Sequence, residues 1–231
     1  MSVAGNLVLS LSLSACLIAP GSSAGDSEPQ WRAGTASVVI TPQKNMWMAG
    51  YAARKKPSEG KVHELFAKAL ALADRSGNRL VILTVDLIGI PKELRAAVEE
   101  ALKERYNLPP ECLLMNASHT HCGPEIRMAV PDRYGTVPEG REANIEYSRK
   151  LPGKLIELAG KAIERIEPAE LLYSHARCGF AMNRRLPTER GVRNSPNPDG
   201  PVDHDVPVLQ VKSPAGKLRA VLFGYACHAT T

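Results

Sequence analysis

The sequence of 231 residues predicts an α/β fold in which a mixed, partly parallel sheet is flanked by helices. Short apolar runs bounded by polar residues recur along the chain and are typical of strands. Two longer stretches repeat apolar residues at spacings of three and four, the pattern of an amphipathic helix. One of these helices lies between two apolar runs, and such a strand–helix–strand unit normally joins parallel strands.

The first half of the predicted sheet is antiparallel. Residues 36–41 form a strand that Pro42 ends, and residues 45–60, which contain glycine, proline and lysine, indicate a loop. Residues 65–73 and 80–85 follow as two strands, joined by a Ser-Gly-Asn turn that suits a hairpin. The second of these runs is apolar on both faces, which predicts a central strand.

A parallel crossover comes next. Pro91 should open a helix, because proline is favoured in the first helical turn, and the helical pattern ends before Pro109. Residues 112–116 form the following strand. Asp86 and His119, which follow the two parallel strands, should therefore emerge at the same edge of the sheet.

The second half of the chain alternates loops with strands after one more helix. A long loop at 123–140, of the kind that often covers a site, precedes a helical stretch at 142–167 that Pro152 should kink or interrupt. The remaining expected elements are strands at 171–175, 206–211 and 218–226 and a polar, proline-rich loop at 184–201.

The N-terminus resembles an export signal. Residues 7–18 are apolar over the length of a signal-peptide core, and a small-residue cleavage site ends at Ala24. Residues 13–16 also resemble a lipoprotein box, in which Cys16 would carry the lipid, and the apolar stretch is too short to span a membrane. We expect a signal at 1–24, a linker at 25–32 and one domain at 33–231, located in the periplasm, outside the cell or on a lipid anchor.

The net charge and the cysteine spacing limit the kinds of ligand that the chain is expected to bind. The net charge of +5 is mild. The sequence has no basic stripe with interleaved aromatic residues, so it does not indicate nucleic-acid binding. The charge is compatible with weak attraction to an anionic membrane surface. The sequence contains no CxxC spacing, so it does not indicate a zinc site made of cysteines. Cys112, Cys122, Cys178 and Cys227 are expected to be small buried residues at strand ends rather than disulfide partners.

Two histidine motifs follow apolar runs. The first, SHTH at 118–121, contains His119 and His121, and the second, ACH at 226–228, ends in His228. Histidines two apart on an extended backbone lie on one face, and histidine is a preferred zinc ligand. Two interpretations stay open: a metal site, or hydrogen-bonded rings at strand ends. Asp86 could orient a histidine or cap the turn after its strand.

The polar loop adds a second candidate. Asn183 and Arg184 lie near its start, and an arginine beside a metal can hold a carboxylate or an oxyanion because its guanidinium is a rigid fork of donors. A solvated loop arginine is the alternative. Residues 203–205 are interpreted as a polar turn, and His63 and His175 as structural.

Several of these segments resemble the N-terminal part of the catalytic domain of neutral/alkaline non-lysosomal ceramidases, and they occur in the same order along the chain. They are residues 117–124 (ASHTHCGP), Asn183 with Arg184, residues 203–211 and residues 223–230 (FGYACHAT). An early segment, His63 with residues 65–73, is also similar. The resemblance runs from residue 33 to residue 231.

The resemblance implies a zinc-hydrolase catalytic domain of α/β fold. It implies that His119 and His228 are zinc ligands, and that His121, Asn183 and Arg184 contact the substrate, His121 and Arg184 acting in catalysis. The implied reaction is hydrolysis of ceramide, an N-acylsphingosine, to a fatty acid and a sphingoid base, with zinc polarising the carbonyl and lowering the pKa of a bound water.

The family's further zinc ligands, a glutamate and a tyrosine, have no counterpart in this sequence. We therefore expect a truncated domain with little or no turnover. Residues 125–127 depart from the small residues and glycine that the family usually has there, which leaves the acyl-chain preference open. Two alternatives remain. One is another HxH metal hydrolase, such as an amidohydrolase barrel, although that places HxH after its first strand. The other is an exported, non-catalytic domain that binds a lipid or a partner.

Overall fold

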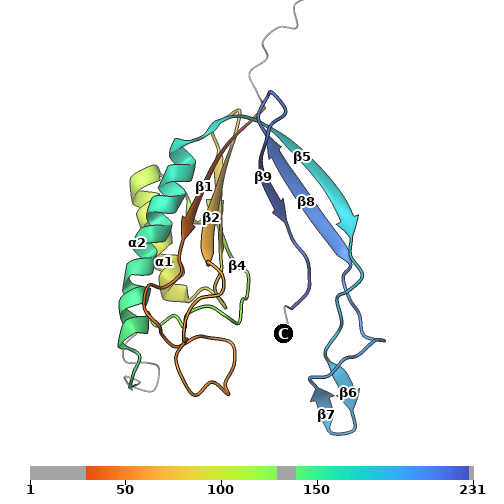
Figure 1. The fold of residues 1–231 in the computed structure, drawn as a ribbon. Helices are drawn as coiled ribbons and strands as arrows, with labels where there is room; N and C mark the ends of the chain where they lie inside the picture. Colours follow the sequence, from red (N-terminus) through yellow and green to blue (C-terminus); the bar gives the residue numbers. More distant parts are fainter. Residues whose placement is uncertain (1–29, 129–138, 229–231) are drawn as a thin grey trace, which may run out of the picture.

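A computed structural model describes residues 30–128 and 139–228 (Figure 1). The expected signal segment at 1–24 and Cys16 lie outside these ranges. Seven strands form one sheet in the order β4-β3-β2-β1-β5-β8-β9, and β6 and β7 form a separate hairpin. The elements are β1 (Trp31–Val39), β2 (Phe66–Asp74), β3 (Arg79–Val85), α1 (Lys92–Tyr106), a 3-10 turn (Pro110–Cys112), β4 (Leu113–Ala117), α2 (Glu142–Glu164), β5 (Glu167–Arg177), β6 (Leu186–Thr188), β7 (Gly191–Arg193), β8 (Asp205–Lys212) and β9 (Leu218–Phe223).

The predicted mixed sheet is confirmed. β3 and β4 are parallel and are connected through α1, whereas the other neighbouring strands of the sheet are antiparallel. β2 and β3 form the expected hairpin, with Gly77 at a positive φ of 85° in its turn. β3 is an interior strand with β2 on one side and β4 on the other, next to the edge of the sheet rather than at its middle.

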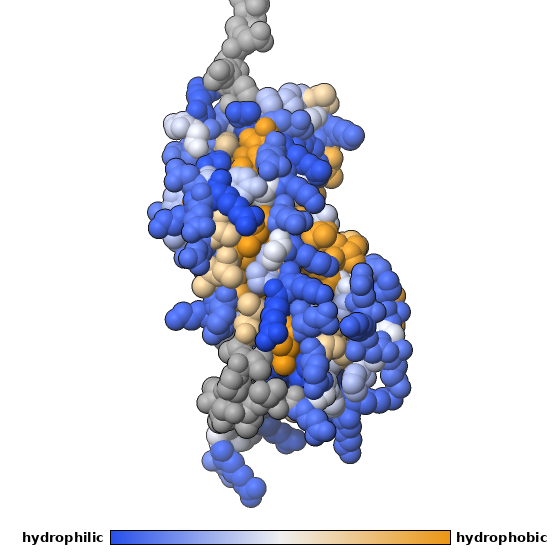
Figure 2. Space-filling view, turned by 90° about the vertical axis from the view of Figure 1, so that its left-hand side faces the viewer, coloured by the Kyte–Doolittle hydropathy of each residue, from blue (hydrophilic) through white to orange (hydrophobic). Residues whose placement is uncertain are grey.

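Both helices cover the same face of β1–β4 (Figure 1). Alternate residues of the strands meet one apolar stripe on each helix, as a strand period of two and a helix period near 3.6 require. The fully buried side chains at this layer include Val81, Leu83 and Val85 of β3, Leu94, Val98 and Leu102 of α1, and Leu151, Leu155 and Leu158 of α2. The outward face of this helical side is largely hydrophilic, with apolar side chains in narrow strips (Figure 2).

One glycine sets how closely α2 lies on the sheet. A side chain at Gly34 of β1 would overlap the carbonyl oxygen of Ala162 in α2. The helix therefore packs directly on the backbone of β1. Any residue other than glycine at position 34 would force α2 or β1 to move.

The other half of the sheet is built differently. β5, β8 and β9 splay away from β1–β4, and no helix of the described residues covers them (Figure 1). β5 joins β1 through three residue pairs, Trp31–Ala33 with Glu167–Ala169. A small second core lies at this junction and is made of Ala33, Leu70, Leu72, Ile82, Ala169 and Val211.

The structure corrects the expectation for Pro152. α2 runs without interruption from Glu142 to Glu164, with Pro152 inside it. An internal proline costs a helix about 3 kcal/mol, but Leu151 and Leu155 on either side are almost completely buried. Burial of a leucine contributes about 1.5–3 kcal/mol, so packing on the sheet offsets the local cost. The helix ends before residue 167 because Glu167 already pairs in β5.

Several boundaries also differ from those expected. β1 begins at Trp31, so residues 31 and 32 of the expected linker are strand, since they pair with β2 and β5. The loop at 184–201 contains the β6–β7 hairpin, whose Gly191 has a φ of 105°. β9 ends at Phe223 rather than at residue 226.

The cysteines are less buried than expected. Cys122 and Cys227 are exposed, and Cys112 and Cys178 are half-buried, all four as free thiols. Cys122 and Cys227 lie in the segments that leave the strands rather than within them, which explains their exposure. Within the described ranges, neither helix combines the length and apolarity needed to cross a membrane.

Candidate metal centre

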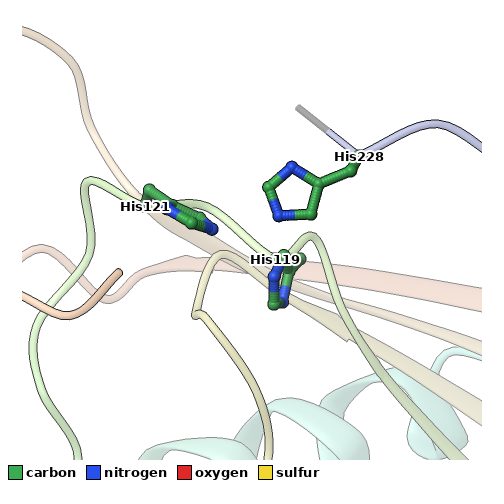
Figure 3. A group of neighbouring side chains, drawn as sticks. All are labelled: His119, His121 and His228. Carbon is green, nitrogen blue, oxygen red and sulfur yellow. The ribbon is translucent and has the colours of Figure 1, made fainter. Parts of the chain in front are cut away.

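Three histidines converge from two distant parts of the chain. One imidazole nitrogen of each of His119, His121 and His228 lies within 4.8 Å of the other two. The ring centroids are 5.1 Å, 4.8 Å and 4.9 Å apart for the pairs 119–121, 119–228 and 121–228. The rings face a common centre, with His228 arriving from the segment after β9 (Figure 3). The two sequence motifs therefore meet in space.

The parallel β3–β4 pair explains the position of His119. The chain leaving β4 stays beside the end of β3, because the Ser118 N–H donates to the Val85 carbonyl at 2.9 Å. His119 then turns sharply, with a φ of 55° that residues other than glycine rarely adopt. Its Nδ1 donates to the Ile88 carbonyl at 2.6 Å, so the proton is on Nδ1 and Nε2 carries the free lone pair.

His121 differs from His119 in having no such anchor. Both of its ring nitrogens are buried without a hydrogen-bond partner in the described structure. Burial, followed by the charges of His228 and His119, lowers the pKa of His121, so the ring is neutral at neutral pH. A buried polar atom without a partner is unfavourable unless a ligand engages it. The donor set and these unpaired nitrogens therefore fit a metal ion that favours imidazole.

The loop between β1 and β2 forms the wall beside His121. The Ala49 N–H donates to the Gly123 carbonyl at 3.0 Å. Gly50 has a φ of 105°, and a Cβ there would lie 2.6 Å from the Cγ of His121. The Tyr51 ring meets the His121 ring edge-on at 4.9 Å. Arg54 donates from Nη2 to the His121 carbonyl at 2.6 Å.

This loop and the histidines line an open cavity of about 540 Å³. The size is within the range of small-molecule sites. Its lining consists of residues 47–52, Arg54, Ile88, the three histidines, Glu125 and Arg141. Sequence reasoning missed the contribution of Gly50, Tyr51 and Arg54, because the loop has no periodic pattern and its partner is distant in the chain. The glycine before an aromatic residue was the one available signal.

The far wall is held by charged and aromatic side chains. Glu125 accepts hydrogen bonds from Arg127 at 2.6 Å and from Arg141 at 2.8 Å. The Arg141 guanidinium also stacks 3.9 Å from the centroid of the Trp47 ring. The buried amide of Asn144 bonds both backbone groups of Trp47. Glu125 and Arg141 thus form a charged end of the cavity.

Asn183 and Arg184 occupy different environments. The Asn183 amide donates to the Pro201 carbonyl at 2.9 Å and accepts from the Arg185 N–H at 2.9 Å. This residue braces its own loop rather than pointing to the cavity. Burial is the main cause that lowers the pKa of His121, and the charge of Arg184 contributes less than those of His228, His119 and Arg54.

The remaining polar candidates have structural partners. Asp86 accepts a hydrogen bond from the Phe66 N–H at 2.8 Å, which ties the start of β2 to the end of β3. His175 pairs with Asp205 at 3.0 Å, and Asp203 accepts from the Asp205 N–H at 2.9 Å. His63 contacts its neighbour's carbonyl.

Comparison with known proteins supports the fold and the family resemblance of the N-terminal segment. Residues 31–136 match the sequence model of the family described as neutral/alkaline non-lysosomal ceramidase, N-terminal, so the resemblance is confirmed over this segment. Two solved structures have a similar fold, each matched over 86% of this chain at 20% identity: a ceramidase complexed with C2, with a TM-score of 0.67, and the neutral ceramidase from Pseudomonas aeruginosa, with a TM-score of 0.69. The chain spans 31% and 32% of the lengths of those chains. No curated protein sequence matches the chain.

Proposed function

We propose that this chain, with its ceramidase-like N-terminal segment, carries part of the active site of a zinc-dependent hydrolase that cleaves the amide bond of a lipid-like substrate such as N-acylsphingosine. The observation that carries the proposal is the convergence of His119, His121 and His228 on one point of this fold. Neutral imidazoles are preferred zinc ligands.

His119 and His228 would hold the ion. The Ile88 carbonyl orients His119 and leaves its Nε2 directed away from that bond, which is how protein ligands to zinc are usually fixed. Zinc sites use three or four protein donors, so donors outside the described residues would complete the set. When bound, zinc polarises a carbonyl oxygen and lowers the pKa of a coordinated water.

His121 and Arg184 would act on the substrate. A neutral His121 ring beside the scissile amide can exchange a proton or a hydrogen bond with it. The Arg184 guanidinium would stabilise negative charge that develops on the carbonyl oxygen. The cavity next to the cluster has apolar wall residues, Met48, Ala49 and Ile88, that suit a hydrocarbon chain. An exported location, with contact to a membrane surface, belongs to the proposal and is supported by residues 1–24.

The test is zinc content together with hydrolysis of a fluorescent ceramide, measured for this chain and for the longest natural reading frame that contains it. We expect weak zinc binding by this chain and stoichiometric zinc in the longer chain. In the longer chain, zinc should be lost in His119→Ala and His228→Ala and kept in His63→Ala, because His63 is exposed and outside the cluster. Amide cleavage should follow the zinc content.

Two other outcomes would change the proposal. Zinc binding without ceramide cleavage in either chain would retain the metal hydrolase and remove ceramide as the substrate. Absence of zinc from both chains would discard the enzymatic function in favour of a lipid- or partner-binding domain.

A further inference from the structure

We infer that Arg54, in the loop between β1 and β2, is a positioning residue that holds His121 in the histidine cluster. The inference rests on the proposed function for the role of His121, although its test does not require zinc or substrate. It starts from an asymmetry among the rings. The Ile88 carbonyl orients His119 through a hydrogen bond, whereas both nitrogens of His121 have no hydrogen-bond partner among the described residues. The orientation of His121 must therefore come from its backbone and its packing.

Arg54 controls the backbone of His121. Its Nη2 donates to the His121 carbonyl at 2.6 Å, and such charge-assisted bonds are shorter and stronger than neutral ones. The bond joins residues from two segments that are far apart in the sequence. It fixes the peptide group from which the imidazole projects, and hence the direction of the ring.

Arg54 also controls the packing of the ring. Its guanidinium carbon lies 5.2 Å from the centroid of the Tyr51 ring, within the range of a cation–π contact. The same Tyr51 ring meets the His121 ring edge-on at 4.9 Å. A single side chain therefore holds both the main chain of His121 and the aromatic ring against which the imidazole rests.

The loop presents this arrangement as a unit. Its two ends are tied by hydrogen bonds from the Ser58 N–H to the Met46 carbonyl at 2.9 Å and from the Met46 N–H to the Ser58 hydroxyl at 3.1 Å. Nε of Arg54 is buried without a partner, which is unfavourable. The guanidinium stays buried although its Nε lacks a hydrogen bond. Its contacts with the His121 carbonyl, the Tyr51 ring and the Met48 sulfur therefore fix the position of the Arg54 side chain.

The test measures the accessibility of each histidine ring in the metal-free full chain. Diethyl pyrocarbonate modification is followed by mass spectrometry for the wild type, Arg54→Met, Arg54→Lys and the control Lys55→Met, which makes the same charge change at the exposed neighbouring position. In Arg54→Met, the modification rate of His121 should rise severalfold, because its buried nitrogens become accessible. The rates of His63 and His175 should not change. Arg54→Lys, which keeps a charged donor, should restore most of the protection.

A second variant covers the case in which Arg54→Met does not fold. Tyr51→Leu removes the ring between Arg54 and His121 and should also raise the His121 rate. An unchanged His121 rate in folded Arg54→Met or Tyr51→Leu overturns the inference, as does an equal rise at all histidines or an equal rise in Lys55→Met. A wild type that binds no zinc would contradict the proposed function, while this measurement would still decide the role of Arg54.

Discussion

The two halves of the sheet differ in how firmly they are built, and the histidine cluster takes residues from both. β1–β4 are covered by α1 and α2, with which they share a core of eighteen buried residues. The second core has six, of which only Ala169 of β5 and Val211 of β8 come from the open half. The covered half supplies His119 and His121, and the open half supplies His228. Assembly of the site therefore depends on the few contacts that fix the open half against the covered one.

Those contacts are few but specific. Besides the three residue pairs between β1 and β5, Arg219 of β9 donates from Nη2 to the Ala33 carbonyl at 2.8 Å and lies 3.0 Å from the Glu167 carboxylate. The apolar side chains of β9 that face away from this junction are exposed, and Phe223 retains 67% of its accessible surface. Substitutions in the covered half should thus mainly lower the stability of the fold. Substitutions at the junction with the open half should mainly disturb the position of His228.

The largest expected effect tests the difference in packing. Leu83→Ala in β3 removes a fully buried side chain and should lower the free energy of unfolding by about 2–5 kcal/mol. Phe223→Ala in β9 removes a mostly exposed one and should change it by less than about 0.5 kcal/mol. Urea unfolding of both variants measures the difference. Comparable losses in the two variants would mean that the halves are equally packed.

The next effect concerns the wall beside His121. Gly50 and Gly191 both have a φ of 105°, but only Gly50 has a neighbour, His121, in the way of a Cβ. Alanine at either position should add strain of about 1–3 kcal/mol. Only Gly50→Ala should also change the reactivity of His121 toward diethyl pyrocarbonate, since its Cβ would displace the His121 ring. Mass spectrometry of the modified chains distinguishes the two variants, and equal His121 rates would show that the loop yields without moving the ring.

A smaller effect should appear at the junction of the halves. Arg219→Met removes the bonds to Ala33 and Glu167, and each hydrogen bond contributes about 0.5–1.5 kcal/mol. The matched control Lys217→Met changes an exposed residue in the adjacent turn. We expect Arg219→Met to weaken zinc binding through His228 without raising the chemical reactivity of His121. If His121 becomes reactive as well, the junction holds the whole site rather than the open half alone.

The smallest effect is a pH dependence. The folded chain lowers the pKa of His121 below its unfolded value, so the unfolded state binds more protons as pH falls. The metal-free chain should therefore be most stable above the unfolded pKa of histidine, about 6.5, and should lose stability as pH falls through it. His121→Asn should flatten this dependence. Urea midpoints from pH 7.5 to pH 5 provide the measurement, and an identical slope in His121→Asn would remove His121 as its source.

The elements that were predicted correctly are those with strong local patterns. β2, β3 and α1 have apolar periods that match their burial, and the order of β3, α1 and β4 places His119 at the sheet edge. Pro152 shows the limit of local reasoning, because the burial of Leu151 and Leu155 outweighs the preference of proline. The start of that helix at Glu142 was predicted correctly, but its end at Glu164 depends on the start of β5 at Glu167.

The site was predictable in its donors but not in its enclosure. The motifs identify His119, His121 and His228, yet their meeting requires that the segments leaving β4 and β9, the two edge strands of the sheet, come together, which no local pattern specifies. Arg54 and Tyr51 act only through contacts with a residue distant in the chain. Asn183, a motif position expected at the substrate, has its amide engaged in hydrogen bonds within its own loop, and its contact with a substrate stays a prediction.

The left-handed backbone of His119 has a consequence for how this site could change over time. A histidine at a φ of 55° is held in a conformation that glycine or asparagine adopts more easily. Replacement by glycine would relax the turn after β4 at the cost of the hydrogen bond from His119 to the Ile88 carbonyl. Under the proposed function it would also remove a zinc ligand, so in a lineage released from selection for the chemistry that single hydrogen bond would be the main contribution to the fold that is lost with the histidine.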